Sequence, residues 1–429
     1  MSSRPRRRLY DSSSTEGGRN AAKSSARRHK PDYWILILTS LLLVIGLVVV
    51  YSISPGLAAS LHVSQGYFIT KQLIDVGLGL GIFAVAAYLP SSWWWRSAKP
   101  LAIVAIVGSL VVMFTPIDAV YQAHRWIRLG GFSFQIAELI KLALLTYMAR
   151  FLSMQWQAGK IADFKETFQP LLILLIAVGL VVAKFQSDLG STGVMVAMIV
   201  LMVFAVGVPL KKVAMISALV LVLLVLAISS SAYRRERLAT FLHPQSNCQG
   251  NGYQACQALI AVGSGGIFGL GLGYSVQAYG YLPEASNDSI FAIMAEKFGF
   301  IGTVAIVVVY GAFIARLKRI IEHTQDQFKR LLVVGVLAWL STQMIINIGA
   351  MLGLLPLKGI TLPLISQGGT SLIFLMAALG LVFQISRYTS YSKSEPETSV
   401  RQQSNNYYNP NGRRLGRAHS APATTRPRT

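Results

Sequence analysis

The sequence predicts an all-α integral membrane protein with about ten transmembrane helices. Of its 429 residues, 53% are hydrophobic and only 13% are charged, about half the charged fraction of a typical soluble domain. Several apolar runs exceed the ~18 residues that a helix needs to cross a bilayer. Lys and Arg gather at both ends of the chain and in alternate loops. Together these observations exclude a soluble multi-domain protein.

Hydropathy read in windows of about 20 residues places ten spans along the chain. They lie at 33–53, 72–89, 101–116, 135–155, 168–184, 189–207, 213–231, 289–315, 331–352 and 367–386. The fourth is the least apolar, because Glu138, Lys141 and Arg150 interrupt it. Glu138 and Lys141 are three residues apart on a helix, so we expect a structural ion pair inside the bundle.

The loops differ in charge, and this difference predicts the orientation. One set of loops holds twelve basic residues and the other set about half as many. The richer set contains Arg96, Lys99, Arg150, Lys160, Lys165, Lys211, Lys212, Arg316, Lys318, Arg319, Lys329 and Arg330. Because basic loops stay inside the cell, both termini are predicted to be cytoplasmic. Residues 232–288 then form one long extracytoplasmic loop between spans seven and eight.

The two ends of the chain, 1–32 and 387–429, are predicted to be disordered cytoplasmic tails around a membrane domain at 33–386. They are rich in Ser, Asn, Pro and Arg and carry more than half of the net charge of +22. Basic segments beside spans attract anionic membrane lipid, so nucleic acid is not expected as a partner. The first span is too long for the core of a signal peptide and is predicted to be an uncleaved anchor.

The long loop contains both cysteines of the chain and a series of glycines. Cys248 and Cys256 can form a disulfide in that compartment or remain as two thiols. The glycines between Gly263 and Gly273 resemble a phosphate loop, but no Gly-Lys-Ser/Thr follows them. Close backbone packing, or a nest of backbone amides for an anion, is the expected role. No spacing of His and Cys fits a structural zinc site.

Asp288 stands immediately before the eighth predicted span. Water, lipid headgroups and the low-dielectric interior meet at such a position, and burial and neighbouring charges can tune the pKa of a carboxyl there. A proton-transfer role is one interpretation. The alternative is a helix N-cap, because Asp before a helix accepts hydrogen bonds from otherwise unpaired backbone N–H groups.

Four polar clusters lie at the predicted outer ends of the spans. They are 125–131, 186–190, 233–237 and 358–371. Each has a purely structural alternative: Arg side chains often reach the headgroups, Asp188 can cap the sixth span, and the small residues from Ser366 to Ser371 can form a packing face. Taken together, cations for a pyrophosphate and a carboxylate for a hydroxyl proton suit a lipid diphosphate that carries a sugar.

These clusters resemble the SEDS family (shape, elongation, division and sporulation) of membrane glycosyltransferases. The resemblance covers about 33–386. Its most specific parts are Tyr281-Leu282-Pro283-Glu284-Ala285 followed by Asp288, and the segment from Lys358 to Ser371. Further matches are Arg125-Trp126, Ala137-Glu138-Leu139 with Lys141, Gln186 with Asp188-Leu189-Gly190, Gly252-Tyr253-Gln254, and Glu296 with Gly299. The residues around Tyr281 and from Lys358 to Ser366 favour the cell-division branch, with the elongation and sporulation branches as the alternatives.

The resemblance implies an enzyme that polymerises lipid II into peptidoglycan at the outer membrane face, with Asp288 as the general base. The residues expected to contact the substrate are Arg125, Arg234, Arg237, Lys358, Glu284, Gln186, Asp188 and Ser366. A divalent cation, Mg²⁺ or Mn²⁺, is a possible cofactor that would help to stabilise the leaving diphosphate. The implied partners are a class B penicillin-binding transpeptidase and division-site proteins, at the septum of a bacterial cell membrane.

Two other function classes fit parts of the sequence. A lipid II flippase would use intramembrane charges such as Glu138 and Lys141 as a pathway, but the polar clusters gather at one face and no inverted repeat is evident. A non-catalytic division scaffold would only recruit partner proteins and would need no catalytic residue. The sequence also departs from the family pattern at Ile136, Ser187, His243, Ser286, Asn287 and Gln367. The resemblance therefore predicts the reaction class more closely than the positioning of the substrate.

Overall fold

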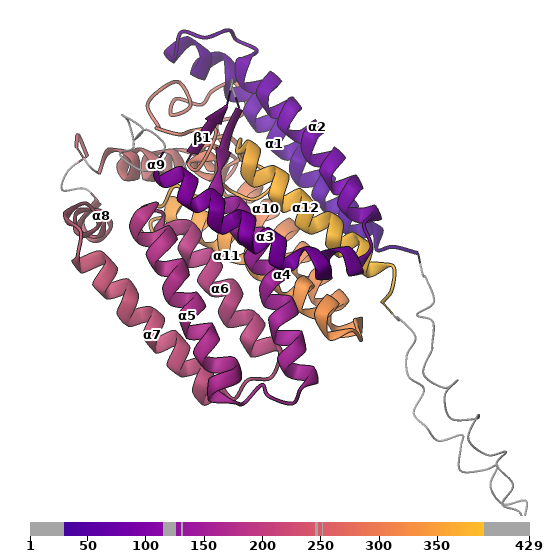
Figure 1. The fold of residues 1–429 in the computed structure, drawn as a ribbon. Helices are drawn as coiled ribbons and strands as arrows, with labels where there is room; N and C mark the ends of the chain where they lie inside the picture. Colours follow the sequence, from indigo (N-terminus) through magenta and orange to yellow (C-terminus); the bar gives the residue numbers. More distant parts are fainter. Residues whose placement is uncertain (1–29, 115–125, 130–131, 245–247, 251, 390–429) are drawn as a thin grey trace, which may run out of the picture. The chain divides into compact units, whose positions relative to one another are not determined.

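The computed structural model describes residues 30–114, 126–129, 132–244, 248–250 and 252–389, and each of the ten predicted spans is a helix in it (Figure 1). The long helices are α1 (Tyr33–Ser60), α2 (Tyr67–Tyr88), α3 (Ser91–Met113), α4 (Ile136–Gln157), α6 (Leu189–Ala205), α7 (Leu210–Ser229), α10 (Ile290–His323), α11 (Gln327–Met351) and α12 (Gly369–Ser386). The fifth predicted span is continuous as η1 (Phe164–Phe168), α5 (Gln169–Val178) and η2 (Gly179–Phe185).

Eight helices in the described part of the chain are long and apolar enough to cross a membrane. The two exceptions have simple reasons. Helix α6 is apolar but only 17 residues long, and α4 carries Glu138, Lys141 and Arg150. The prediction of an all-helical, multi-pass membrane protein is thus confirmed, whereas ten spans and the direction in which they face stay predictions.

The described chain begins and ends at the same end of the helix bundle. The Asp32 backbone N–H donates to Ser386 Oγ at 3.0 Å, and Asp32 also pairs with Arg316 at 2.5 Å. We call this the terminal end. Helices α8 (Ala232–Leu242) and α9 (Tyr253–Ser264) and strand β1 gather at the opposite end, which we call the loop end (Figure 1).

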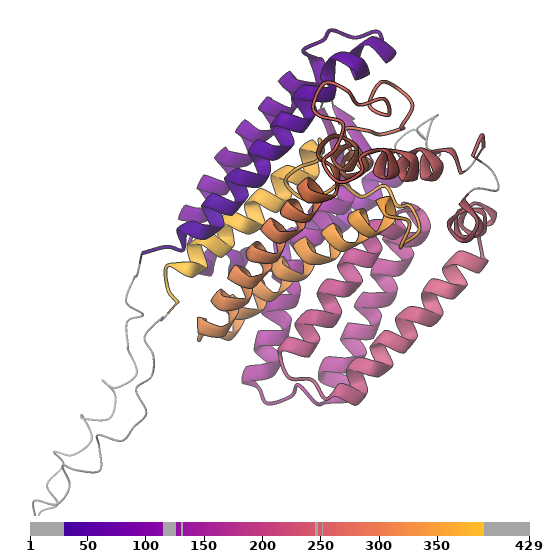
Figure 2. The ribbon, with the colours of Figure 1, turned by 180° about the vertical axis from the view of Figure 1, so that it is seen from behind.

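Small residues let α2 and α12 pack closely. A side chain at Gly380 of α12 would place its Cβ 2.4 Å from the Phe83 carbonyl oxygen of α2, so only glycine fits there. Figures 1 and 2 both show the indigo pair α1 and α2 lying along the yellow α12. This contact brings the start of α12, with the segment before it, to the loop end.

A short hairpin adds the only strands found among the described residues. Strand β1 (Trp126–Leu129) pairs in antiparallel register with β2 (Phe132–Gln135), so that Trp126 lies opposite Gln135. Thr370 Oγ1 of α12 donates to the Ser133 carbonyl at 2.9 Å. The hairpin is therefore held against the start of α12.

The long loop is folded, as the sequence predicts. Cys248 and Cys256 form a disulfide with a Cα–Cα distance of 5.6 Å, which settles the alternative that the sequence leaves open. Two of the loop glycines, Gly265 and Gly269, pack closely on α10. A Cβ at Gly265 would come within 2.0 Å of the Ala295 carbonyl oxygen, and one at Gly269 within 2.2 Å of the Lys297 carbonyl oxygen. Close backbone packing is thus confirmed for these two glycines and stays a prediction for the others of the series.

Candidate functional site

Asp288 lies at the loop end, half-buried, two residues before α10 begins. The N-cap of α10 is Ser289, and no side chain there caps the helix. The cap alternative for Asp288 is therefore wrong. Its Oδ1 atom is buried and has no hydrogen-bond partner among the described residues. A carboxylate oxygen placed in this way keeps its lone pairs available for a substrate hydroxyl.

Asn347 of α11 joins Asp288 to the segment that follows Lys358. Its Nδ2 atom donates at 2.7 Å to the Asp288 carbonyl oxygen and at 2.7 Å to the Ile360 carbonyl oxygen. A second link lies nearby, because the Gln367 backbone N–H donates to the Ser286 carbonyl at 2.9 Å. The two most specific sequence motifs, far apart along the chain, thus form one unit.

The pKa of Asp288 is raised from its usual value of 3.8 to about 7. Burial is the largest cause, because it disfavours the charged form, and the negative charge of Glu284 adds to it. Arg237 and the side-chain amide of Gln254 oppose the rise. A carboxyl with a pKa close to the pH of the cell can take up and release a proton efficiently.

Lys358 faces the same region and has the opposite shift. Its pKa is lowered from 10.5 to about 8, first by burial and then by Arg237 and Arg234, while Asp188 opposes the change. Arg237 donates through Nη1 to the Leu357 carbonyl at 3.3 Å, so α8 is fixed beside this segment. Three cations crowded together, two of them half-buried arginines, form a site that an anion would stabilise.

Asp188 both caps a helix and faces the cations. Its carboxylate accepts from the Ser191 backbone N–H at 2.9 Å and from Ser191 Oγ at 2.8 Å, which confirms the predicted cap of α6. Gln135 Nε2 also donates to it at 3.2 Å. A Cβ at Gly190 would lie 3.4 Å from the Lys358 Cβ, so the start of α6 packs directly on the lysine.

Glu138 and Lys141 form the predicted ion pair at 2.8 Å, and both side chains are almost fully buried. Lys141 also donates to Gln343 Oε1 at 3.3 Å and lies over the Trp339 ring. Gln343 in turn donates to the Thr361 carbonyl at 3.0 Å. The pair is therefore linked through Gln343 to the Lys358–Ser371 segment and has a structural role.

The other predicted contact residues lie around this unit in different settings. Glu284 is exposed, has a positive φ of 53°, and accepts from Asn287 Nδ2 at 2.5 Å. Gln186 is buried where η2 ends. Ser366 is also buried, and its Oγ accepts from the Leu362 backbone N–H at 2.7 Å, which shapes the segment itself. Arg234 donates to the backbone of α7 and η2. Arg125 lies outside the described residues.

Three amides that bond to Asp288 or to the Lys358–Ser371 segment were not among the predicted site residues. Gln254 faces the carboxylate and donates to Ser289 Oγ at 3.1 Å, and only its family motif marks it in the sequence. Asn347 and Gln343 stand inside an apolar helix. Polar amides inside a predicted span are the one signal that could have found them.

The expected divalent cation has no ready-made protein cage in the described part of the chain. No group of three or more His, Cys, Asp or Glu side chains is close enough there to hold a metal ion. The charges of the Glu284 and Asp288 carboxylates interact with each other, and Asp188 lies beside Lys358. A cation would need oxygens from a bound diphosphate as well, so its role stays a prediction.

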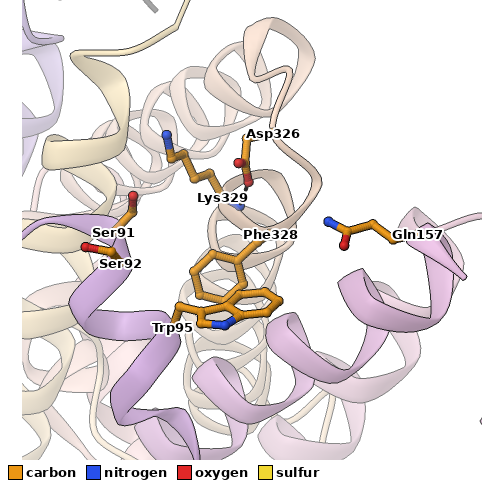
Figure 3. A pocket seen from close by; sticks show the side chains of 7 residues that line it. All are labelled: Ser91, Ser92, Trp95, Gln157, Asp326, Phe328 and Lys329. Atoms are coloured by element: carbon orange, nitrogen blue, oxygen red, sulfur yellow. Dashed lines mark hydrogen bonds between the residues drawn. The ribbon is translucent and has the colours of Figure 1, made fainter. Parts of the chain in front are cut away.

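A pocket of about 240 Å³ lies elsewhere, where α3, α4 and α11 meet (Figure 3). Asp326 there caps α11 by accepting from the Lys329 backbone N–H at 2.9 Å. The Trp95 and Phe328 rings pack edge to face with their centroids 4.9 Å apart. These side chains serve the helix junction, and none of them belongs to the predicted site.

The fold and the site define a class: a multi-pass helical membrane protein with a tunable carboxylate and a cluster of cations at one end of its bundle. Comparison with known proteins identifies the family. The chain belongs to the cell cycle protein family of FtsW, RodA and SpoVE, which matches residues 33–391. The resemblance to SEDS proteins that the sequence shows is thereby confirmed.

Relatives from two branches of this family are similar over most of the chain. Stage V sporulation protein E of Bacillus subtilis is 35% identical over 370 residues, which cover 86% of this chain and 100% of that protein. The probable peptidoglycan glycosyltransferase FtsW of Coxiella burnetii is 36% identical over 366 residues, 83% of this chain and 96% of that protein. Both the sporulation and the division branch thus stand at about the same identity.

Solved structures share the fold. A structure described as "Structural coordination of polymerization and crosslinking by a peptidoglycan synthase complex" has a chain that matches with a TM-score of 0.67 and 25% identity, over 83% of this chain and 98% of that one. The rod shape determining protein RodA of Thermus thermophilus matches with a TM-score of 0.60 and 27% identity, over 85% of this chain and 98% of RodA.

Proposed function

We propose that this chain is a peptidoglycan glycosyltransferase that polymerises lipid II, and that Asp288 is its general base. The observation that carries the proposal is the half-buried Asp288 carboxylate, with one oxygen without a partner among the described residues and a pKa of about 7 beside a group of cations. The family and the probable glycosyltransferase activity of the relatives support the reaction class.

The proton transfer follows from the position of the carboxylate. Asp288 takes the proton from the 4-hydroxyl of the GlcNAc in an acceptor lipid II, while that oxygen attacks the MurNAc anomeric carbon of the growing strand. The bond from this carbon to the polyprenyl diphosphate breaks, and the new glycosidic bond forms with inversion. A well-placed base contributes about 10²–10⁴-fold to such a step.

The cations stabilise the leaving group. Polyprenyl diphosphate departs with negative charge, and Lys358, Arg237 and Arg234 interact electrostatically within one region of the loop end. Burial strengthens their effect on a diphosphate because the local dielectric constant is low. Asp188 and the α6 N-terminus fix Lys358 by packing against it. The loop end faces the outside of the cell in this proposal.

The test is polymerisation of lipid II by the purified full-length protein and its Asp288→Asn variant, alone and with a transpeptidase partner. Glycan strands on a gel are expected to disappear with the variant, a loss of about 10²-fold or more. Asp163→Asn is the matched control, because Asp163 is an exposed cap of η1, whose backbone hydrogen bonds asparagine can keep. Full activity of the Asp288 variant would overturn the role of this residue.

The same proteins in liposomes separate the enzyme from a flippase. A flippase would move labelled lipid II across the bilayer without forming polymer. The structure favours the enzyme, because Glu138 and Lys141 neutralise each other deep in the bundle and the remaining site charges interact at the loop end. Polymer formed by the wild-type protein also excludes a purely non-catalytic scaffold.

The cellular role follows as a proposal of its own. We infer that the protein acts in septal wall synthesis with a class B penicillin-binding transpeptidase and division-site proteins. The similarity to FtsW and to a chain of a peptidoglycan synthase complex supports it. Depletion should give filaments that lack septa, and a fluorescent fusion should gather at midcell. A defect restricted to spores, or a dispersed fusion, would contradict the division role.

A further inference from the structure

A glycine-rich segment, residues 265–276, lies against the first part of α10, and we call it the strap. Helix α10 leaves helical geometry at Gly299, with φ 65° and ψ −165°. The strap provides hydrogen-bond partners for backbone groups of α10 around this break. Phe300 N–H donates to the Gly266 carbonyl at 2.9 Å, and the Glu296 carbonyl accepts from Leu270 N–H at 2.9 Å. The backbone polar groups at this junction are therefore paired inside the protein.

Two side chains of α10 also turn towards the strap. The buried Glu296 carboxylate accepts from Ser275 Oγ at 2.5 Å and from the Val276 backbone N–H at 2.9 Å. Lys297 Nζ donates to the Leu272 carbonyl at 2.5 Å. Ser275 Oγ, the Val276 N–H and the Leu272 carbonyl of the strap are thus bound on the side that faces α10.

The other side of the strap is apolar and uncovered. Glycines alternate with large side chains, and two of the glycines, Gly265 and Gly269, face α10, because a Cβ there would clash with the Ala295 and Lys297 carbonyl oxygens. The exposed side chains are Ile267 at 62%, Phe268 at 81%, Leu270 at 40%, Leu272 at 44%, Tyr274 at 79% and Val276 at 57%. From Leu238 to Pro283 the chain contains no Asp, Glu, Lys or Arg.

The base of the strap, where Gly266 and Ile267 pair with Phe300 and Ile301, lies at the depth of the hydrocarbon core. The ion pair of Arg316 with Asp32 marks the terminal end of α10, and Phe300 precedes Arg316 by 16 residues, a rise of about 24 Å along a helix. The hydrocarbon core is about 30 Å thick. Phe300 and Ile301 are 66% and 52% exposed beside the strap, so the apolar surface continues from α10 onto it.

We propose that the strap is a re-entrant membrane segment whose exposed side chains contact lipid acyl chains. Irregular backbone is stable at this depth only when its polar groups are satisfied within the protein, and the broken part of α10 meets that condition. The aromatic side chain of Tyr274 would lie near the interface, where Tyr is favoured. The proposal concerns the bilayer and does not depend on the proposed reaction.

Spin labelling of the full-length protein in lipid nanodiscs tests this depth. A nitroxide is attached at Phe268→Cys, while the native Cys248 and Cys256 are joined and do not react. Collision with the polar reagent NiEDDA should be roughly tenfold lower than at Ser64→Cys, an exposed position in the α1–α2 turn. Collision with oxygen should match that at Val307→Cys, an exposed position on α10.

Two results would overturn the proposal. NiEDDA accessibility at Phe268 equal to that at Ser64 would place the strap in water. Low accessibility to both reagents would show that protein, such as a second copy of the chain, covers it. A label at Leu272→Cys gives an independent check, because the strap rises from its base and NiEDDA accessibility should lie between the values at Phe268 and Ser64.

Discussion

Two groups of opposite charges in this protein differ in how they are satisfied. Glu138 and Lys141 meet at 2.8 Å inside the bundle, with Gln343 and the Trp339 ring around the lysine. Asp288 Oδ1 has no hydrogen-bond partner among the described residues, although the positive charge of Arg237 acts on this carboxyl. The first arrangement neutralises charge, whereas the second keeps it available. The difference teaches that burial of charge by itself does not mark a reactive site.

Disruption of the Glu138–Lys141 pair has the largest expected effect on stability. Glu138→Gln leaves the Lys141 charge buried without its partner, which should lower the free energy of unfolding by about 3–5 kcal/mol. The double change Glu138→Gln with Lys141→Met removes both charges and should cost clearly less. Thermal unfolding in detergent measures this. Equal losses in the single and the double variants would contradict the view that the pair is a mutually neutralising structural unit.

Removal of the Asp288 charge should have the opposite effect on stability. Because its folded pKa of about 7 exceeds its unfolded pKa, the folded state binds the proton more tightly between these values. Stability is then lost as the pH rises through this range. Asp288→Asn should therefore stabilise the protein by about 1–3 kcal/mol at pH 8 and hardly at all at pH 4. Melting temperatures at both pH values measure this, and a variant less stable at pH 8 would contradict it.

Much of this contrast could be predicted from the sequence, but not all of it. Spacing on one helix predicts the Glu138–Lys141 pair, and hydropathy predicts the helices that hold it. The position of Asp288 depends instead on Asn347 of α11, which joins the Asp288 carbonyl to the Ile360 carbonyl of the following segment. The loss of the α10 geometry at Gly299 and the β1–β2 hairpin also arise from tertiary contacts. No local pattern encodes such contacts.

The pH dependence of polymerisation sharpens the comparison further. Asp288 must be deprotonated to act as base, and Lys358 must be protonated to hold a diphosphate. The rate should therefore fall below about pH 7 and again above about pH 8, by up to about tenfold per pH unit on each limb. Lys358→Arg should remove the alkaline limb, because Arg stays charged. An unchanged alkaline limb in that variant would assign it to another group.

Asn347 should affect the rate less than Asp288 does, because it acts on Asp288 only through the backbone. Asn347→Ala leaves the carbonyls of Asp288 and Ile360 without a donor, at a cost of about 1–3 kcal/mol in stability. If Asn347 also positions the base, the rate at saturating lipid II should fall by about tenfold while KM changes little. The control is Ser341→Ala on the same helix, where the lost hydroxyl bonds only within α11. A rate equal to that of the control would reduce Asn347 to a purely structural residue.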